Sequence, residues 1–202
     1  MNIRNTQRSS WPDDLRDSRF ASTIRTDSPE GCRIGLIGLP DDTGVRLNGG
    51  RPGAALGPHA VRAALAKYGA RDTVGLPAVF DAGDVKPGET LDETHRRVTE
   101  ATTDLLEAGL LPVAIGGGHD LTYPFVRAVA QKADGPLVGV YFDAHLDVRK
   151  ETGSGMSFRK LVDECGVKEL HIHGLDPLSN SIEHIRWFTS HGGRMDPFGP
   201  DE

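Results

Sequence analysis

The chain has 202 residues, with 23 basic and 29 acidic side chains and a formal net charge of −6. This length suits one domain with a sizeable core, and the acidic balance with scattered basic residues excludes nucleic acid as the expected partner. The sequence has no apolar stretch long enough to span a membrane, and its first 29 residues lack the apolar centre of a secretory signal. We therefore expect a cytoplasmic protein without a membrane partner.

The expected elements begin after residues 1–30, which are rich in Arg, Asp and Ser and predict a polar arm with one short helix near residues 13–19. From residue 31 to 202, short apolar runs alternate with segments of helical periodicity, which predicts one α/β domain with parallel strands. The expected strands are 33–38, 78–83, 111–115, 137–142 and 169–173. The expected helices are 58–68, 91–108, 122–132, 158–165 and 181–190.

The residues after the last expected helix interrupt this alternation. Where a further apolar strand would follow, residues 194–202 contain two prolines, a glycine and several acidic side chains. Proline cannot donate to a strand ladder and is excluded from central strands. We therefore expect a truncated domain with no strand after the last helix, a sheet that is incomplete at the C-terminal end, and an open sheet edge.

Two groups of side chains with metal-binding chemistry follow expected strands. His119 comes after a glycine triplet, and Asp143, His145 and Asp147 come after the most apolar strand. Ligand sites of parallel sheets lie beyond the carboxyl ends of the strands, and carboxylates with imidazoles bind Mn, Fe, Ni or Zn. Side chains alternate along an extended chain, so we expect Asp143, His145 and Asp147 to point to one side. The sequence predicts a metal site at this edge.

The glycine triplet and the histidines also have structural interpretations. A glycine triplet after a strand is often a tight turn or a phosphate-binding loop, but neither G-x-G-x-x-G nor a following Lys-Ser/Thr is present. His171 and His173 alternate in a strand and are expected to be structural. We expect the remaining histidines on helices or helix ends to be solvated: His59, His95, His184 and His191.

Three stretches, in this order, resemble the ureohydrolase family of arginases, agmatinases and formimidoylglutamases: residues 44–58, 116–120 and 143–147. The resemblance covers about residues 31–193. It implies an arginase-like three-layer α/β/α fold around a parallel sheet, and a manganese-dependent hydrolase that cleaves C–N bonds of linear amidines. The family pattern would place His119 and Asp147 on the first of two Mn²⁺ ions, His145 on the second and Asp143 on both.

Within the family, the chain looks most like the formimidoylglutamases, which convert N-formimidoyl-glutamate to glutamate and formamide in histidine degradation. The loop after Asp147 reads Asp-x-Arg followed by Ser-Gly-x-x-Phe; Phe158 stands where arginases carry a histidine, and Ser154 where agmatinases tend to have one. Arginine and agmatine are the alternative substrates. Guanidinium groups could clamp a substrate carboxylate, and the candidate substrate-binding residues are Arg46, Asn48, Arg51, Arg149 and Ser154.

The chain departs from the family at the third metal motif, because no Asp-x-Asp occurs after Asp147. We therefore expect at most one weakly bound Mn²⁺ and an impaired hydrolase. Two other interpretations stay open: a non-catalytic arginase-fold fragment or pseudoenzyme with a binding or assembly role, and one subunit of a split enzyme. The resemblance implies a small-molecule substrate and a family-type homo-oligomer.

Overall fold

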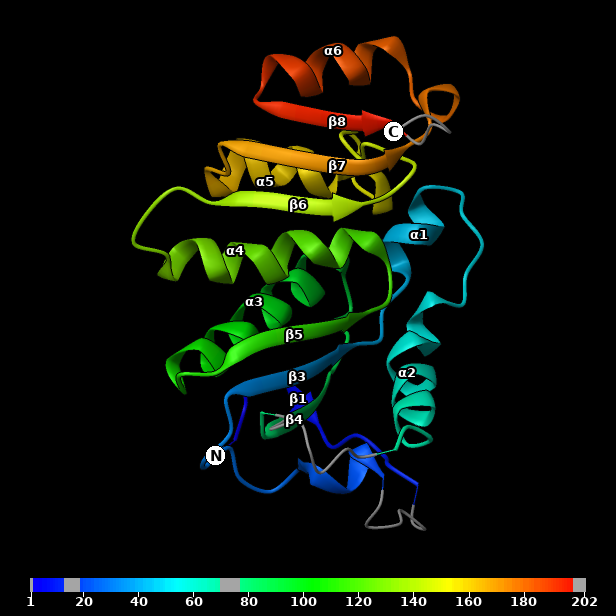
Figure 1. Cartoon of the computed structure of the whole chain (residues 1–202). Helices are drawn as coiled ribbons and strands as arrows, with labels where there is room; N and C mark the ends of the chain where they lie inside the picture. The colour runs from blue at the N-terminus through cyan, green and yellow to red at the C-terminus, as the bar shows by residue number, and fades with distance from the viewer. Residues whose placement is uncertain (1, 13–18, 70–76, 198–202) are drawn as a thin grey trace.

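The computed structural model describes residues 2–12, 19–69 and 77–197 (Figure 1). The strands are β1 (Thr6–Gln7), β2 (Ile24–Arg25), β3 (Ile34–Leu39), β4 (Val79–Val85), β5 (Leu111–Gly116), β6 (Val138–Phe142), β7 (Glu169–Leu175) and β8 (Gly193–Pro197). The α-helices are α1 (Thr43–Leu47), α2 (Gly57–Leu65), α3 (Leu91–Glu107), α4 (Thr122–Lys132), α5 (Ser157–Cys165) and α6 (Ile182–Ser190). The short helix expected near residues 13–19 lies outside the described residues.

The strands form two sheets (Figure 1). The first has the order β1-β4-β3-β5, with β2 also pairing with β4, and the second has the order β6-β7-β8. Only β1 is antiparallel to its neighbour; the other described strand pairs are parallel. The expected α/β alternation with parallel strands is confirmed, because helical crossovers are what parallel neighbours require.

The first core lies between β3, β4, β5 and α3. Thr90 caps the start of α3 by accepting a hydrogen bond from the Glu93 amide, and Leu91, Val98 and Leu105 follow at helical spacing on its buried face. That face packs against Ile37 of β3, which is fully buried. The long helix is thus fixed by its cap and by its apolar stripe.

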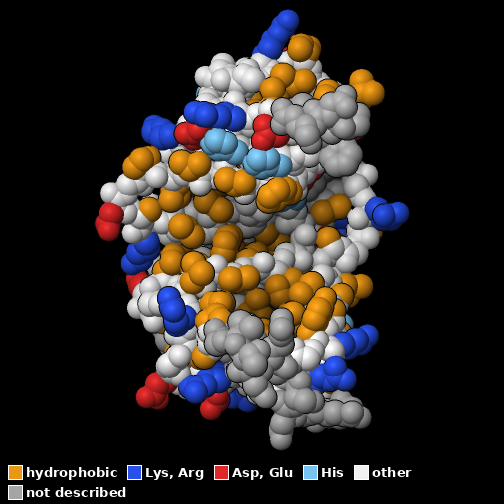
Figure 2. Space-filling model, viewed as in Figure 1, with side chains coloured by type: hydrophobic (Ala, Val, Ile, Leu, Met, Phe, Trp, Pro, Cys, Tyr) orange, Lys and Arg blue, Asp and Glu red, His pale blue; other side chains and the backbone are white. Residues whose placement is uncertain are grey.

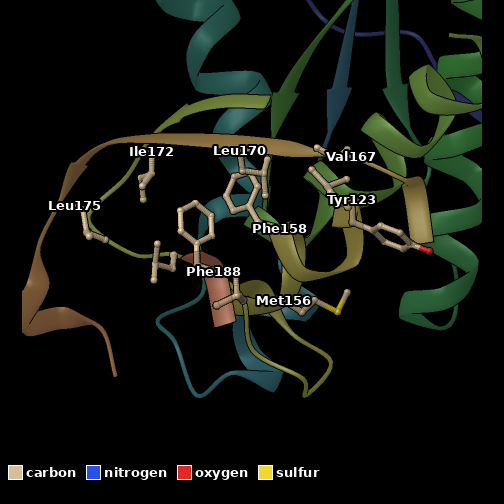
Figure 3. Close-up of a cluster of buried hydrophobic side chains, with 11 residues drawn as sticks. Tyr123, Met156, Phe158, Val167, Leu170, Ile172, Leu175 and Phe188 are labelled. Carbon is tan, nitrogen blue, oxygen red and sulfur yellow. The ribbon is translucent and has the colours of Figure 1, made fainter. Parts of the chain in front are cut away.

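The second core joins α4, α5, β7 and α6 (Figure 3). Phe158, Leu170, Ile172 and Phe188 fill its centre, and each is nearly inaccessible to solvent. Residues of a loop that leaves β6 also belong to this core, with Leu146 and Val148 both completely buried. The candidate metal-binding loop is therefore anchored by apolar packing on both sides of Asp147.

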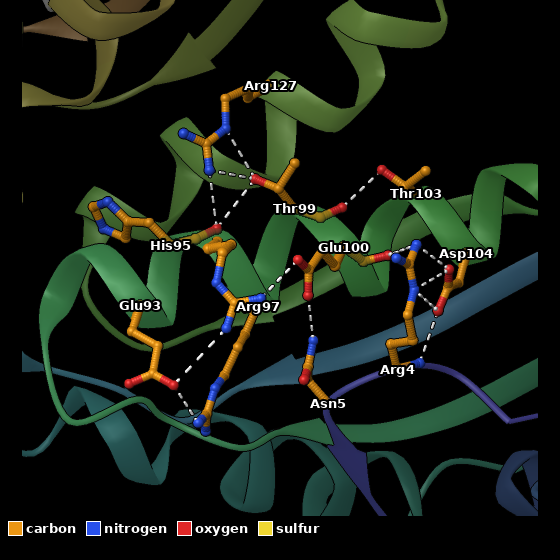
Figure 4. A network of polar contacts seen from close by, with 11 residues as sticks. Arg4, Asn5, Glu93, His95, Arg97, Thr99, Glu100, Thr103, Asp104 and Arg127 are labelled. Carbon is orange, nitrogen blue, oxygen red and sulfur yellow. Dashed lines mark hydrogen bonds and ion pairs between the residues drawn. The ribbon is translucent and has the colours of Figure 1, made fainter.

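The N-terminal residues that the structure describes pack on the first sheet. Ile3 is buried in the first core, and β1 pairs with the end of β4 at Thr6 and Val85. Arg4 binds Asp104 of α3 through its guanidinium, with an Nη2–Oδ1 distance of 2.6 Å (Figure 4). This segment carries many polar side chains, and several of them bind the domain.

The expectation that no strand follows the last helix is wrong. Residues Gly193–Pro197 form β8, which runs parallel to β7 with Leu170 opposite Gly193 and Leu175 opposite Pro197. β8 has one described neighbour, so it lies at the sheet edge, where a proline at the strand end costs little. The two sheets are instead separated between β5 and β6, in the middle of the element order. Among the described strands, open edges therefore lie at β8 and also at β5 and β6 in the interior of the fold.

None of the helices in the described part of the chain combines the length and the apolar character that a bilayer crossing requires.

Candidate metal centre

The carboxyl ends of β5 and β6 meet at one polar cluster. His119 begins a short 3-10 turn directly after the glycine triplet that ends β5, and Asp143 is the first residue after β6. The Nδ1 atom of His119 lies 2.6 Å from Oδ2 of Asp147 and 3.6 Å from Oδ2 of Asp143. One ligand atom from each of these three residues lies within 4.8 Å of the other two.

The cluster is partly buried, and its charges act on His119. Burial disfavours the charged imidazolium, but the hydrogen bond to Asp147 and the charges of Asp143 and Asp120 outweigh this effect and raise the pKa of His119. These interactions favour the protonated form of the ring beside the two carboxylates. A divalent cation would take the place of that proton.

His145 does not join this cluster, contrary to the expected alternation along an extended chain. The strand ends at Phe142, so residues 143–147 form a loop and the side-chain alternation stops there. The ring of His145 lies beside Asp143, with an Nδ1–Oδ1 distance of 3.2 Å, and its side chain is 59% exposed. His145 therefore contacts Asp143 from a solvent-exposed position and lies outside the cluster of His119, Asp143 and Asp147.

The loop holds Asp147 in a backbone conformation that few residues adopt. Asp147 has a φ of +46°, the left-handed region that non-glycine residues enter at a cost. Asn180 fixes the loop by accepting a hydrogen bond from the Leu146 amide at 2.9 Å and donating to the Ala144 carbonyl at 2.8 Å. The Asp147 carbonyl also accepts from the Phe158 amide. These bonds from distant segments compensate for the local strain.

Aromatic rings form one wall beside the cluster. Phe158 meets the His119 ring edge-on, with centroids 5.3 Å apart, and stacks on Tyr141 at 3.6 Å. Burial, followed by the charges of Asp147 and Asp143, raises the pKa of Tyr141, so this phenol stays protonated. Ser157 donates to the His119 carbonyl at 2.6 Å. The sequence did not indicate these roles for Ser157 and Tyr141.

The candidate substrate-binding residues lie on α1, on the loop after it and on the loop after β6. Arg149 donates from Nη1 to Oδ1 of Asn48 at 3.1 Å, which joins the loop after β6 to the end of α1. Ser154 begins a 3-10 turn beside this contact. Arg46 points to Asp42, with an Nη2–Oδ1 distance of 3.0 Å, and Arg51 is exposed. The fold brings Asn48 and Arg149 together, while Arg46 forms a separate ion pair.

A buried pair behind the cluster corrects the expectation that His95 is solvated. Nε2 of His95 lies 2.9 Å from Oδ2 of Asp120, and both side chains are almost fully buried. The His95 carbonyl accepts from Arg127 (Figure 4). His95 lies four residues after Leu91 and three before Val98, so its place on the apolar stripe of α3 could have been read from the sequence. The pair ties the turn that carries His119 to α3.

The donor set of the cluster fits a divalent metal ion of the kind that the family resemblance implies. Two carboxylates and one imidazole are suitable ligands for Mn²⁺, and one ligand atom from each lies within 4.8 Å of the others. The surrounding hydrogen bonds from Asn180 and Ser157 orient the ligand-bearing segments, as outer partners do in metal sites.

Comparisons with known proteins agree with this geometry. The family model described as the arginase family matches residues 32–194. The chain is 35% identical to the mitochondrial guanidino acid hydrolase of Homo sapiens, covering 83% of this chain and 51% of that protein. It is 34% identical to the formimidoylglutamase of Aromatoleum aromaticum, covering 78% of this chain and 50% of that protein. The chain thus spans about half the length of the curated relatives it matches.

Solved structures give the same fold. The Trypanosoma cruzi formiminoglutamase with Mn²⁺ superposes with a TM-score of 0.82 at 30% identity, covering 90% of this chain and 65% of that chain. The formimidoylglutamase of Bacillus subtilis superposes with a TM-score of 0.80 at 26% identity, covering 94% and 62%. The expected arginase-like α/β fold is confirmed. The order of its motifs, its fold and the matched family model show that this chain belongs to the arginase family.

Proposed function

We propose that this chain carries the metal-binding half of a formimidoylglutamase-type hydrolase, which cleaves N-formimidoyl-glutamate to glutamate and formamide. The convergence of His119, Asp143 and Asp147 within 4.8 Å of one another is the observation that carries the proposal. Relatives named formimidoylglutamase support the substrate class, and a structural neighbour is a formiminoglutamase that contains Mn²⁺.

In this proposal His119, Asp143 and Asp147 hold one Mn²⁺, and His145 with Asp143 offers an exposed and weaker second position. A bound divalent ion supplies Lewis-acid activation of water at neutral pH. The residues of the chain position the ion: Asn180 fixes the loop of Asp147, and Phe158 covers one side of His119. We expect binding of one ion to be weak, because the three ligands leave much of its coordination to water.

We assign binding of the substrate carboxylate to the loops after α1 and after β6, which carry Arg51 and Arg149. Arg149 is held by Asn48 through one guanidinium nitrogen, which leaves other donors of the same group for a carboxylate. Arg51 and Ser154 lie on the adjoining loops. Arg46 would bind substrate only by leaving Asp42 or by sharing it.

A guanidino acid is the second candidate substrate, because a relative at 35% identity is a guanidino acid hydrolase. Both candidates combine an electron-poor amidine-type carbon with a distant carboxylate, so the same arginine loops could serve both. Agmatine is less well matched, since it has no carboxylate, and arginine differs from a simple guanidino acid by its α-ammonium group.

We assign residues 1–30 to an N-terminal arm and residues 31–202 to the arginase-like domain, and we expect a cytoplasmic homo-oligomer that acts on a small molecule. The alternatives are a non-catalytic member that binds or assembles, and one subunit of a split enzyme.

The experiment is a parallel assay of the purified chain with Mn²⁺ and N-formimidoyl-glutamate, a guanidino acid, arginine or agmatine. Formamide and glutamate should be released slowly from N-formimidoyl-glutamate, because no Asp-x-Asp follows Asp147 to complete the metal centre. Arg149→Ala should raise the KM for this substrate, whereas Lys150→Ala at the exposed neighbouring position should not. Release of urea from the guanidino acid alone would favour the second substrate. Mn²⁺ binding without any turnover would support the non-catalytic alternative.

A further inference from the structure

The outer edge of the first sheet is shared by two short strands of the N-terminal segment. β1 pairs with β4 in antiparallel fashion at Gln7 and Asp84, and β2 pairs with it in parallel at Arg25 and Phe80. Because β3 takes the other edge of β4, β1 and β2 lie on one edge and run toward each other. Among the described residues, no strand pairs with residues 81–83 on this edge, between the two strand ends.

A cavity of about 660 Å³ opens beside this part of β4. It is lined by residues 80–83 and by residues that follow β1 and β2, and it has no residue in common with the candidate metal centre. Its volume lies in the range of small-molecule sites, about 300–1,000 Å³. The hollow beside His119 is a different one, between α4 and β6, in the middle of the molecule where Figure 2 shows hydrophobic side chains gathered.

One wall of the cavity is fixed by a buried ion pair. Nε of Arg62 lies 2.8 Å from Oδ2 of Asp81, and both side chains are almost inaccessible to solvent. The same carboxylate oxygen accepts hydrogen bonds from Nε1 of Trp11 and from Oγ of Ser9, each at 2.8 Å. These bonds hold the Trp11 indole in one orientation at the cavity wall, so a ligand can pack against the ring without the cost of ordering it.

Two opposite charges face the cavity. Arg8 directly follows β1, Asp27 lies two residues after β2, and both are exposed and line the cavity. Within the parts of the chain that the structure describes, neither side chain has an ion-pair or hydrogen-bond partner. Asp81 differs from them, because Arg62 already neutralises it. The cavity therefore presents one cation and one anion beside an apolar ring.

We propose that this cavity binds a free α-amino acid with an apolar or aromatic side chain. The carboxylate binds Arg8, the ammonium group binds Asp27, and the side chain packs against Trp11. A guanidinium group binds a carboxylate through two parallel hydrogen bonds, and aromatic rings pack favourably on one another. An amino acid carries both charges and no net charge, as Arg8 and Asp27 together do.

Ligands with a single kind of charge are poorer occupants. A phosphate would bind Arg8 but would lie beside the carboxylate of Asp27. An amine without a carboxylate would bind Asp27 and leave Arg8 without a partner. Discrimination of this kind arises from unpaired and like charges as much as from favourable contacts. A molecule that carries both charges satisfies both side chains.

The experiment titrates the full 202-residue chain with L-phenylalanine as the probe. Trp187→Phe leaves Trp11 as the remaining tryptophan, so binding in the cavity should change the fluorescence. Phenethylamine lacks the carboxylate of the probe and hydrocinnamate lacks its ammonium group, and each should bind about tenfold more weakly. Arg8→Gln should weaken L-phenylalanine and hydrocinnamate about fivefold and leave phenethylamine unchanged. Asp27→Asn should weaken L-phenylalanine and phenethylamine and leave hydrocinnamate unchanged.

The controls are Arg186→Gln and Asp134→Asn, which remove exposed charges on other segments and should leave the affinity for L-phenylalanine unchanged. Circular dichroism establishes that each variant folds. Unchanged Trp11 fluorescence with L-phenylalanine, equal affinities for the three molecules, or an Arg8→Gln variant that loses phenethylamine as much as hydrocinnamate would overturn the proposal. Neither manganese nor an amidine substrate is used, so this result is independent of the proposed hydrolase activity.

Discussion

His119 and Asp147 lie 28 residues apart in the sequence, and their side chains meet with an Nδ1–Oδ2 distance of 2.6 Å. Each residue follows a strand of a different sheet, so their contact is one of the links between the two halves of the fold at the functional end. Groups outside the cluster hold this contact, among them Asn180 beside the Asp147 loop and His95 behind the turn that carries His119.

Replacing His95 with alanine should destabilise the chain by about 3 kcal/mol, since it leaves the buried Asp120 carboxylate without its partner. Oδ1 of Asp120 already lacks a hydrogen bond, so the variant would leave both oxygens unsatisfied. Urea denaturation measures the change. His59→Ala, at an exposed position of α2, is the control and should change the free energy of unfolding by less than about 0.5 kcal/mol. Equal effects would contradict a structural role for the pair.

Replacing Asn180 with alanine should weaken Mn²⁺ binding by about 10- to 100-fold, as loss of outer partners does in other metal sites. The side chain bonds both Leu146 and Ala144, so its loss should free the loop that holds Asp147 with φ at +46°. Isothermal titration measures the affinity. Ser179→Ala removes a hydroxyl bonded to Asp176 and should leave the affinity unchanged. An unaltered affinity for Asn180→Ala would show that the loop is fixed by apolar packing alone.

Acid should loosen the loop after α1, which carries Arg51 and Gly53, because it protonates Asp42. The hydrogen bond from the Gly53 amide, together with Ala55 and the charge of Arg46, outweighs burial and lowers the pKa of Asp42 below 3.8. A carboxyl with a depressed folded-state pKa stabilises the fold above its unfolded pKa, and that contribution is lost as the pH falls through the folded value. Amide exchange at Gly53 should therefore stay slow at pH 5 and accelerate below about pH 3.8.

The variant Asp42→Ala should show fast Gly53 exchange already at pH 7, with no further acceleration below pH 4. Asp27→Ala, in the N-terminal part of the chain, serves as the control and should keep the acid-dependent profile. A flat profile in the unchanged chain would remove Asp42 from the account of this loop.

Much of the fold follows from local sequence patterns. The helix at residues 122–132 was predicted with its observed bounds, because it begins after a turn and its apolar residues recur at helical spacing. β8 was missed because Asp196 and Pro197 argue against a central strand, and only the edge position explains how they are tolerated. The sequence could not predict that the strands form two sheets either, because strand pairing depends on contacts between segments that are distant in the sequence.

The candidate site shows the same limits. His119, Asp143 and Asp147 were selected from their types and their places after strands, and the fold brings them together. The expected alternation of Asp143, His145 and Asp147 does not hold, because that rule applies only while the chain is extended, and β6 ends at Phe142. The contact of Asn180 with the loop spans more than 30 residues, so no local pattern indicates it.

Titration of the purified chain with Mn²⁺, monitored by electron paramagnetic resonance, tests the central claim most directly. The unchanged chain should bind one ion, Asp147→Asn and His119→Ala should each weaken this binding at least tenfold, and His145→Ala should have a much smaller effect. Binding that survives both Asp147→Asn and His119→Ala, or that is abolished by His145→Ala alone, would contradict a metal centre formed by His119, Asp143 and Asp147.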